Sequence, residues 1–265
     1  MTRIKNGGGK NKEERLQEAL TNYLTILREV EEKVTVSYGE FQESTTAPKQ
    51  NSRLEQIKLF LDYLTKHIDL IHRRLVLGET IPHEEKLFSL FESHTEWVTK
   101  GKARPNVELG HRLLVTTNQN GFIVDHKVME KTTDSTEVPE LIERLRQRYD
   151  SVASLSFDKG FYSAENKEKV AEFADLVVMP KKGKLTKAEQ EEQRSPQFQK
   201  LRHAHSAVES DINCLEHHGL DRCPDKGLAN YKRYVALGVL TYNLHKVGNN
   251  LMGIKRGKQT KARAA

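Results

Sequence analysis

Two acidic residues stand in local contexts that could let them do chemistry. Asp158 directly follows a short, mostly apolar run, Ser154 to Phe157, and precedes Gly160, which lets the chain turn sharply. This pattern predicts a carboxylate at the carboxyl end of a β-strand, the edge at which ligands gather in open α/β sheets. An ordinary Asx turn would leave the same local pattern. Asp158 is therefore a candidate metal ligand, with a structural turn as the alternative.

Glu209 lies at the border of the apolar face of a predicted helix. Its neighbour Val208 is expected to face inward, together with Ile212 and Leu215. A carboxylate in this place costs free energy unless it pairs with a cation or holds a metal. A surface glutamate paired with lysine or arginine is the alternative. A strand aspartate and a helix glutamate that meet at one sheet edge would form a site of hard oxygen ligands, which Mg²⁺ or Mn²⁺ prefers.

Strand and helix signals alternate through the middle of the chain. The pair Asn120-Gly121 tolerates positive φ and predicts the turn of a β-hairpin. The expected order is strand, strand, helix, strand, helix, strand, which predicts an α/β fold with a mixed sheet. The expected elements are a hairpin over Val107–Met129 (Leu109, Leu113 and Val115 on one strand; Phe122, Val124 and Val128 on the other), a helix capped by Asp134 or Ser135 and reaching about Tyr149, strands at Ser154–Phe157 and Leu176–Met179, and a helix from Ser163 to about Phe173.

Helical patterns dominate both sides of this α/β region. Two amphipathic helices are predicted before it, and their length favours an antiparallel pair. A charged loop or solvated helix and two further helices are predicted after it, followed by a basic, disordered tail. The expected ranges are Asn11 to about Lys33, Ser52 (as the cap) to Gly78, Lys181 to Arg194, Ala204 to His217, Leu228 to Asn249, and the tail beyond Gly253.

Composition narrows the functional classes. The 265 residues carry a net charge of +6, and a basic balance favours polyanion partners such as DNA. No apolar run approaches the length of a membrane span, and the basic, glycine-rich start does not have the pattern of a signal peptide. Cys214 and Cys223 are too few for a disulfide framework and lack C-x-x-C spacing, so we expect reduced structural thiols in a cytoplasmic protein.

Several stretches together resemble the DDE transposases of bacterial insertion sequences. They are SFDKGFYSAEN around Asp158, AVESDINCLEHHGL around Glu209, and the apolar helix that ends in YNLHK. The segment LFSLFESHTEWVTKGK, followed by ELGHR, is similar to the group of these elements catalogued as not yet classified (ISNCY-like). The resemblance covers roughly Glu85 to Leu251. The motif D-x-G-[FY] alone is weak, and it is the combination that is specific.

The resemblance implies an RNase H-like catalytic domain over residues 85–252, without its first strand. Residues 1–84 would be a helical insertion between the first and second strands of that fold, and residues 253–265 the basic tail. It also implies two divalent ions, Mg²⁺ or Mn²⁺, held by Asp, Asp and Glu, with Asp158 as the second acid and Glu209 as the third. Related families carry Tyr and Arg before the Glu and Lys after it. Here those positions hold Arg202, His205 and Glu216, and we expect Arg202, His205 and Lys159 to contact DNA.

The first acid of the implied triad has no convincing place. Asp62 and Asp69 fall in a helical pattern, Asp125 lies in the second hairpin strand, and Asp134 reads as a helix cap. We therefore expect the first Asp to lie upstream of Met1, which would make this chain a truncated form.

The function implied is that of a transposase. It would bind double-stranded transposon-end and target DNA, cut and join strands with divalent metal, and act as a dimer or larger assembly in the bacterial cytoplasm, nucleoid-associated when bound. The alternatives are a non-catalytic DNA-binding remnant of a transposase, an RNase H-like nuclease, and an α/β protein without a DNA function.

Overall fold

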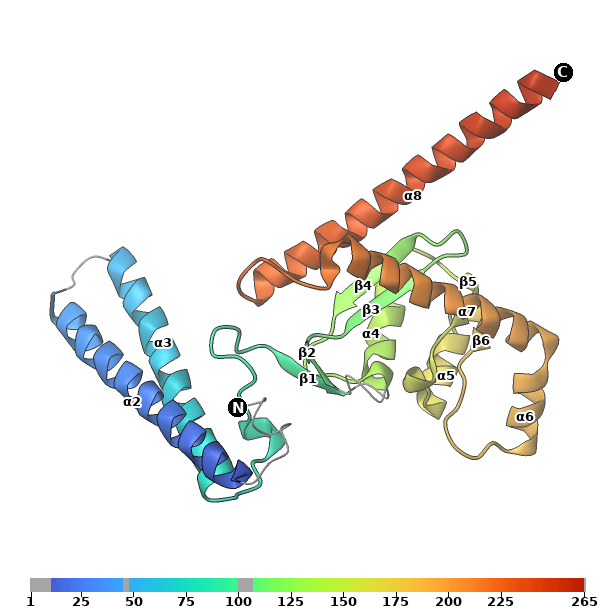
Figure 1. Ribbon diagram of the computed structural model, residues 1–265. Helices are drawn as coiled ribbons and strands as arrows, with labels where there is room; N and C mark the ends of the chain where they lie inside the picture. Colours follow the sequence, from blue (N-terminus) through green and yellow to red (C-terminus); the bar gives the residue numbers. More distant parts are fainter. Residues whose placement is uncertain (1–10, 45–47, 100–106, 265) are drawn as a thin grey trace. The chain divides into compact units, whose positions relative to one another are not determined.

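The computed structural model describes residues 11–44, 48–99 and 107–264, with side chains described up to residue 253 and from residue 50 after the first gap. Its contacts divide the chain into two compact units, Met1–Thr95 and Glu96–Ala265 (Figure 1). This boundary lies C-terminal to the one predicted from sequence after residue 84.

Two long helices form the first unit. Helix α2 (Lys12–Ser44) packs against α3 (Pro48–Ile71) through the buried residues Leu20, Leu24, Leu64 and Ile68. Helix α2 is longer than predicted, because it continues past Gly39 to Ser44. Helix α3 begins and ends earlier than predicted, so Ser52 lies inside it rather than capping it. A π-helix, η1 (His72–Val76), and a short 3₁₀-helix, η2 (His83–Glu85), follow. Gly78 ends the helical run with φ +73, which glycine adopts at little cost.

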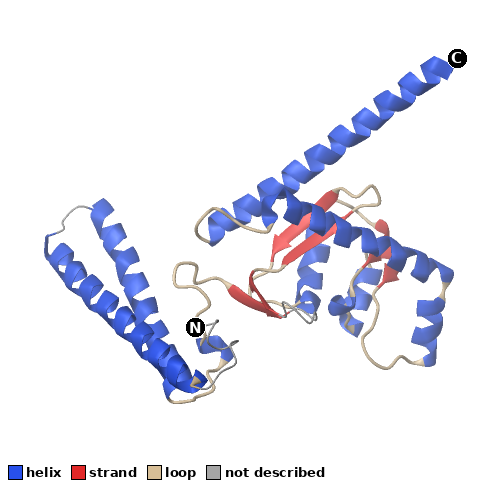
Figure 2. Cartoon of the chain, in the orientation of Figure 1, coloured by secondary structure: helices blue, strands red, loops and turns tan. Residues whose placement is uncertain are grey.

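The strands of the second unit pair into three two-stranded sheets (Figure 2). Two pairs are antiparallel: β1 (Glu96–Thr99) with β2 (Val107–Gly110), and β3 (Leu113–Thr117) with β4 (Ile123–Val128). The third, β5 (Val152–Ser156) with β6 (Ala174–Val178), is parallel. The second unit is thus a mixed α/β structure, as expected, but no hydrogen-bonded ladder joins the described strands into one sheet.

The predicted hairpin forms with the expected turn, but its first strand begins later than predicted. Gly121 has φ +72 and donates its N–H to the carbonyl of Asn118 at 2.8 Å, so the expected turn forms. Residues 107–110 do not belong to this hairpin, because they pair with β1 instead. Gly110, with φ +148, separates β2 from β3. Val124 and Val128 lie in β4 as predicted, whereas Phe122 precedes the strand by one residue. Ile123 and Asp125 are buried, and Val124 is half-buried.

Helices α4 and α5 enclose the main core together with the β5–β6 pair. Helix α4 (Asp134–Arg146) is capped by Thr133 in a reciprocal arrangement with Thr136, so the predicted caps Asp134 and Ser135 were wrong by one or two positions. Ser163 caps α5 (Ala164–Ala171) as predicted, accepting a hydrogen bond from the N–H of Asn166. The core they share includes Val138, Leu141, Ile142, Leu145, Phe157, Val170 and Phe173.

The C-terminal third of the chain is helical. It comprises α6 (Lys187–Arg194), α7 (Pro196–Leu215), the π-helix η4 (Glu216–Leu220) and α8 (Leu228–Ala264). Helix α7 starts earlier than predicted because Ser195 caps it and Pro196 takes its first turn. Helix α8 continues to Ala264, through most of the residues expected to form the basic tail. None of the helices in the described part of the chain has the length and apolarity to span a membrane.

Candidate functional site

Asp158 lies where β5 leaves its parallel partner. The last ladder contact on that side is the N–H of Phe157, which donates to the carbonyl of Val178 at 2.8 Å. Phe157 is buried, whereas the next residue, Asp158, is exposed. One carboxylate oxygen of Asp158 accepts the N–H of Lys159 at 2.7 Å, which caps the 3₁₀-helix η3 (Lys159–Phe161). The capping role considered as the alternative is therefore present, and the carboxylate still faces solvent at the carboxyl end of the strand.

Gly160 lets this loop approach the start of α4. A Cβ atom at Gly160 would lie 2.3 Å from Oδ2 of Asp134, closer than two such atoms can come. Asp134 is held by Arg112, whose Nη1 lies 3.1 Å from Oδ1. A second carboxylate therefore sits beside the Asp158 loop, although its partner is an arginine.

Lysine side chains follow the neighbouring strand at the same edge. Because β5 and β6 are parallel, with Ser156 opposite Val178, the residues after Val178 emerge beside Asp158. Lys181 pairs with Glu189 at 2.8 Å, and this contact lowers the pKa of Glu189 to about 2. Lys182 and Lys184 are exposed and form no ion pair with any residue in the described ranges. Lys182 and Lys184 could therefore bind an anion at the edge of the sheet where Asp158 lies.

Glu209 lies on an exposed face of α7. Arg202 and His205 precede it by seven and four residues and share its face, because residues at this spacing align along a helix. Arg202 and Glu209 are exposed and His205 is half-buried. Glu216, at the position where related families have lysine, falls in η4, beyond the end of α7. Among the described residues, none of the three on α7 forms an ion pair.

The structure brings the two predicted elements together without completing a metal cluster. Helix α7 packs against β5 and β6, the strands that lead to the Asp158 edge. The accessible carboxylates of Asp158 and Glu209 are the oxygen donors that Mg²⁺ and Mn²⁺ favour. Within residues 11–44, 48–99 and 107–264, however, no three acidic, histidine or cysteine side chains gather closely enough to hold an ion. The donor chemistry fits a divalent metal, and the described arrangement supplies at most two of the three acids.

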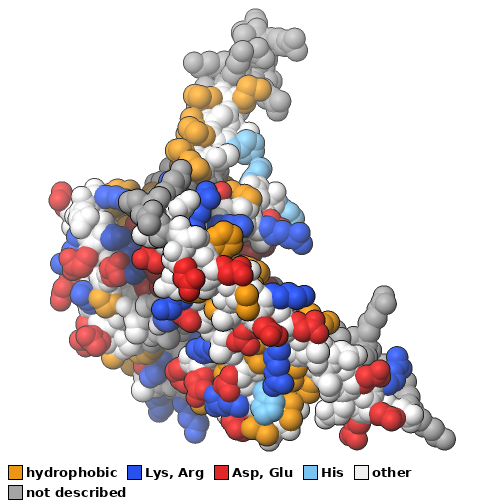
Figure 3. All heavy atoms as spheres, turned by 90° about the vertical axis from the view of Figure 1, so that its left-hand side faces the viewer, with side chains coloured by type: hydrophobic (Ala, Val, Ile, Leu, Met, Phe, Trp, Pro, Cys, Tyr) orange, Lys and Arg blue, Asp and Glu red, His pale blue; other side chains and the backbone are white. Residues whose placement is uncertain are grey.

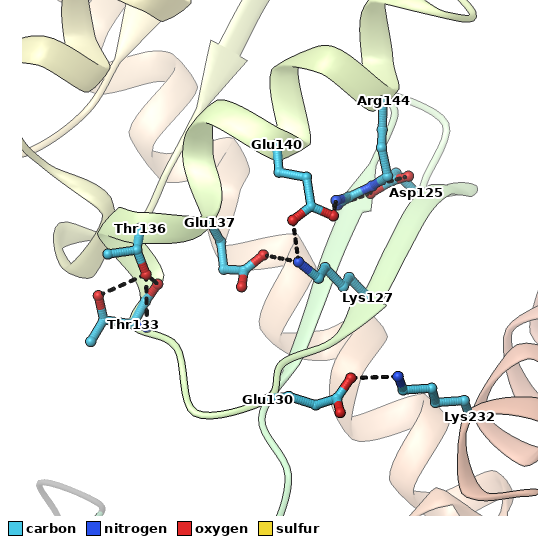
Figure 4. Close-up of polar contacts among 9 residues, drawn as sticks. All are labelled: Asp125, Lys127, Glu130, Thr133, Thr136, Glu137, Glu140, Arg144 and Lys232. Atoms are coloured by element: carbon cyan, nitrogen blue, oxygen red, sulfur yellow. Dashed lines mark hydrogen bonds and ion pairs between the residues drawn. The ribbon is translucent and has the colours of Figure 1, made fainter. Parts of the chain in front are cut away.

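Asp125, considered for the missing acid, is occupied by a structural ion pair (Figure 4). It is 4% exposed and accepts hydrogen bonds from Arg144, at 2.8 Å from Nη2 to Oδ2 and 3.2 Å from Nε to Oδ1. Burial works to lower the pKa of Arg144, but the hydrogen bond and charge of Asp125 outweigh it and raise that pKa. A carboxylate held in this way stabilises the contact between β4 and α4, and its oxygens are already engaged by Arg144.

Asp62 and Asp69, also considered for the missing acid, lie on a helix of the first unit. Asp62 is exposed on α3, and Asp69 is exposed and pairs with Arg73 at 3.4 Å. Both belong to the first unit and lie within the helix, in agreement with the helical pattern of the sequence.

A buried polar cluster around Asp211 was not predicted. Asp211 is 9% exposed, and its Oδ1 accepts the hydroxyl of Tyr242 at 2.5 Å, with Nζ of Lys246 at 3.5 Å. Its Oδ2 is buried and has no hydrogen-bond partner among the described residues. Burial, followed by the contact with Asp211, raises the pKa of Tyr242. The signal was in the sequence, because Asp211 stands four residues before Leu215 on the apolar face of α7.

Comparison with known proteins gives one match. The family model described as the transposase DDE domain matches residues 78–244, which is more than half of the chain. No curated protein and no solved structure matches the chain.

Proposed function

The chain belongs to the transposase DDE domain family, and from this premise we propose that it binds transposon-end DNA and cleaves and joins DNA strands with the help of divalent metal. The observation that carries the proposal is the exposed Asp158, which follows β5 at its carboxyl end, on the edge where Lys182 follows β6. Both strands pack against α7, the helix that carries Glu209. In finer detail, we propose an RNase H-like catalytic domain of the ISNCY-like group, with residues 1–84 as a helical insertion.

Asp158 and Glu209 are proposed to be the second and third acids of the DDE triad. Their carboxylates would hold Mg²⁺ or Mn²⁺, two ions in the complete site. When bound, such ions stabilise the entering and leaving oxygens of an in-line displacement at phosphorus. The first acid is not assigned to any of the four aspartates considered from the sequence, because Asp125, Asp134 and Asp69 have cationic partners and Asp62 lies on a helix of the other unit.

The cationic side chains around these acids would hold the DNA. Lys159 and Lys182 stand at the Asp158 edge, where a phosphodiester would have to enter. Arg202 and His205 share the face of α7 that carries Glu209 and would contact the backbone on that side. Phosphate contacts of this kind position the duplex without reading its sequence.

The test replaces each proposed acid by its neutral isostere. Asp158→Asn and Glu209→Gln should abolish Mn²⁺- or Mg²⁺-dependent cleavage of a duplex carrying the transposon end, because the ligands lose their charge while shape is kept. Binding of the same duplex, measured by mobility shift without metal, should be unchanged. Asp175→Asn and Glu191→Gln are matched controls, since both residues are exposed acids, one at the opposite end of the neighbouring strand β6 and one on α6. Normal cleavage by either site variant would refute its assignment.

A second candidate function is a non-catalytic, DNA-binding remnant of a transposase. It is favoured by the lack of any three-residue metal cluster among the described residues. In this case the wild-type chain binds transposon ends and leaves them uncut at every metal concentration. Cleavage of DNA without joining of a 3′-hydroxyl end to target DNA would instead favour an RNase H-like nuclease.

A further inference from the structure

Helix α7 carries a buried carboxylate two residues after Glu209. Residues at this spacing lie about 200° apart around a helix, so the side chains of Glu209 and Asp211 point to nearly opposite sides of α7. Glu209 is exposed, whereas Asp211 is 9% exposed and faces α8 and the turn of the β3–β4 hairpin. A rotation of α7 about its axis would therefore move both carboxylates together.

Three segments that are distant in the sequence meet at Asp211. Its Oδ1 lies 2.5 Å from the hydroxyl of Tyr242 and 3.5 Å from Nζ of Lys246, both on α8. Lys246 also donates to that hydroxyl at 3.0 Å, and the hydroxyl lies 3.1 Å from the carbonyl of Gly121. The hydroxyl has one proton, and a carboxylate is the stronger acceptor, so we expect Tyr242 to donate to Asp211. The cluster ties α7 to α8 and to the hairpin turn.

The hairpin turn leaves room for the lysine of this cluster. A Cβ atom at Gly121 would clash with Nζ of Lys246, because the ammonium group passes beside the bare Cα atom. Gly121 is thus required by the close approach of Lys246 as well as by its φ of +72.

The cluster lies on the buried face of α8. Val239 and Tyr242 pack with Ile123 of the hairpin and Leu215 of α7 in one apolar group. Other apolar side chains of α8 lie on the surface of the molecule (Figure 3). The buried face of α8 is therefore the one that holds α7 against the hairpin.

Asp211 is poorly suited to a role in stability alone. A buried carboxylate needs partners for its oxygens, and Oδ2 of Asp211 is buried without a hydrogen-bond partner among the described residues. A leucine has the same branched outline and would leave no polar atom unsatisfied. The hydrogen bond with Tyr242, however, forms only over a narrow range of distances and angles, whereas apolar burial is non-directional. Asp211 thus restricts the rotation of α7 more sharply than an apolar side chain would.

Glu209 depends on its helix for its position. Its side chain is exposed, and no ion pair with a described residue holds it. Helix α7 packs against β5 and β6, the strands that lead to the edge where Asp158 lies. A displacement of about 1 Å at a reacting centre can lower a rate about 100-fold. The rotation of α7 therefore matters for a metal site that needs both carboxylates.

We propose that Asp211 is a positioning residue for the candidate metal site. Its contacts with α8 and the hairpin turn fix the rotation of α7, and this rotation sets the carboxylate of Glu209 relative to Asp158. The inference rests on the proposed function, because it requires that Glu209 holds the metal. It extends that function by giving a buried residue on the other side of the helix the task of orienting Glu209.

The replacement Asp211→Leu separates positioning from stability. The midpoint of urea unfolding, followed by circular dichroism, should be unchanged or higher, because the buried charge is removed and Tyr242 can donate to the carbonyl of Gly121. The rate constant of Mn²⁺-dependent cleavage of a transposon-end duplex, measured at saturating DNA, should fall at least about tenfold. The Mn²⁺ concentration that gives half of the maximal rate should rise, and binding of the duplex without metal should be unchanged.

Two further variants keep the test decisive. Tyr242→Phe removes the hydroxyl and keeps the ring, so it should lower the cleavage rate constant as Asp211→Leu does. Arg144→Met is the control with the opposite expectation. It should lower the unfolding midpoint, because Asp125 loses its main partner. Its cleavage rate constant should be unchanged at a temperature where the variant is folded, since this contact joins β4 to α4 and not to α7.

Glu209→Gln distinguishes failure of this inference from failure of the proposed function. If Glu209→Gln abolishes cleavage while Asp211→Leu and Tyr242→Phe cleave at the wild-type rate, the positioning role is wrong and the function stands. If Glu209→Gln cleaves normally, or the wild type does not cleave, the proposed function fails and the positioning role fails with it. An equal loss of rate in Arg144→Met, or losses of rate that only follow unfolding, would show that Asp211 is an ordinary stabilising residue.

Discussion

Three aspartates of the second unit have different roles because their neighbours differ. Asp125 and Asp211 are buried, and each is held by groups from other elements, Arg144 in one case and Tyr242 with Lys246 in the other. A buried carboxylate is tolerated only with such partners. Asp158 is exposed, and its carboxylate accepts the N–H of the next residue. Of these three, only Asp158 has a side chain that is open to solvent.

The pairing of Asp125 with Arg144 should matter for stability rather than for chemistry. Arg144→Met would leave the Asp125 charge buried without its main partner and should lower the free energy of unfolding by about 2–4 kcal/mol. The measurement is urea denaturation followed by circular dichroism. Arg146→Met is the control, because its contact with Glu172 at 3.3 Å is exposed and surface pairs contribute about 0–1 kcal/mol. Equal losses in the two variants would contradict the structural role of Asp125.

His126 should make stability depend on pH. Burial is the main cause that lowers its pKa below the ordinary 6.5, and the charges of Arg148 and Arg144 act in the same direction. Below pH 6.5 the unfolded chain therefore binds a proton that the folded chain does not, so stability falls as pH decreases. The wild type should lose more stability between about pH 7 and pH 5 than His126→Gln. Because His67, whose pKa is also lowered by burial, is present in both chains, its contribution cancels in the comparison. Parallel profiles for the two chains would contradict the prediction.

At the scale of elements, α8 fixes the tip of the β3–β4 hairpin. The side-chain amide of Asn243 accepts the N–H of Ile123 and donates to its carbonyl, both at 2.9 Å. The hydroxyl of Tyr242 lies 3.1 Å from the carbonyl of Gly121 and also contacts Asp211 on α7. The side-chain amide of Asn243 thus makes the two backbone contacts that a neighbouring strand would otherwise make. Through Tyr242, the same turn of α8 also links the hairpin to α7, the helix that carries Glu209.

Loss of this amide should destabilise the hairpin selectively. Asn243→Ala leaves the N–H and the carbonyl of the buried residue Ile123 without their side-chain partner, which should cost about 1–3 kcal/mol. Hydrogen exchange should show faster exchange at the Ile123 amide, while the amides of α4 and α5 are affected only through global stability. Asn249→Ala, an exposed position on the same helix, serves as the control and should change stability by less than about 0.5 kcal/mol. An unaltered exchange rate at Ile123 would show that the amide does not hold the hairpin.

At the scale of the whole molecule, the net charge of +6 is small for a chain of 265 residues. We therefore expect DNA affinity to depend on which lysine and arginine side chains lack an acidic partner, rather than on the total net charge. Lys127, Lys167 and Lys181 are all engaged by glutamates of neighbouring elements. Lys182 has no such partner among the described residues and stands at the Asp158 edge.

This difference predicts unequal effects of two adjacent lysines on DNA binding. Lys182→Gln should weaken binding of duplex DNA and reduce the slope of log affinity against log salt by about 1, because one phosphate contact is lost. Lys181→Gln should change the slope less, since Lys181 already neutralises Glu189. The comparison needs fluorescence anisotropy titrations at several salt concentrations. A larger effect of Lys181→Gln would place the DNA elsewhere.

The sequence by itself determined the features that depend on near neighbours. The turn at Gly121, the Ser163 cap, the strand that ends before Asp158 and the apolar helices all follow from residues within a few positions of one another. The transposase family is likewise indicated by short motifs, each of them a run of consecutive residues. The start of α7 is also determined by neighbouring residues, the cap Ser195 and Pro196 in the first turn, although the sequence analysis placed it later.

Only the tertiary structure decided which distant groups meet. The pairing of β2 with β1, the contact of Asp125 with Arg144 and the burial of Asp211 against Tyr242 join residues from separate elements. No periodicity encodes such contacts, because a carboxylate on an apolar face has the same sequence pattern whether an arginine, a tyrosine or a metal ion satisfies it. Helix α8 combines the two levels. The regular spacing of Leu237, Leu240 and Leu244 is in the sequence, but only the folded unit shows that this face of the helix is left exposed.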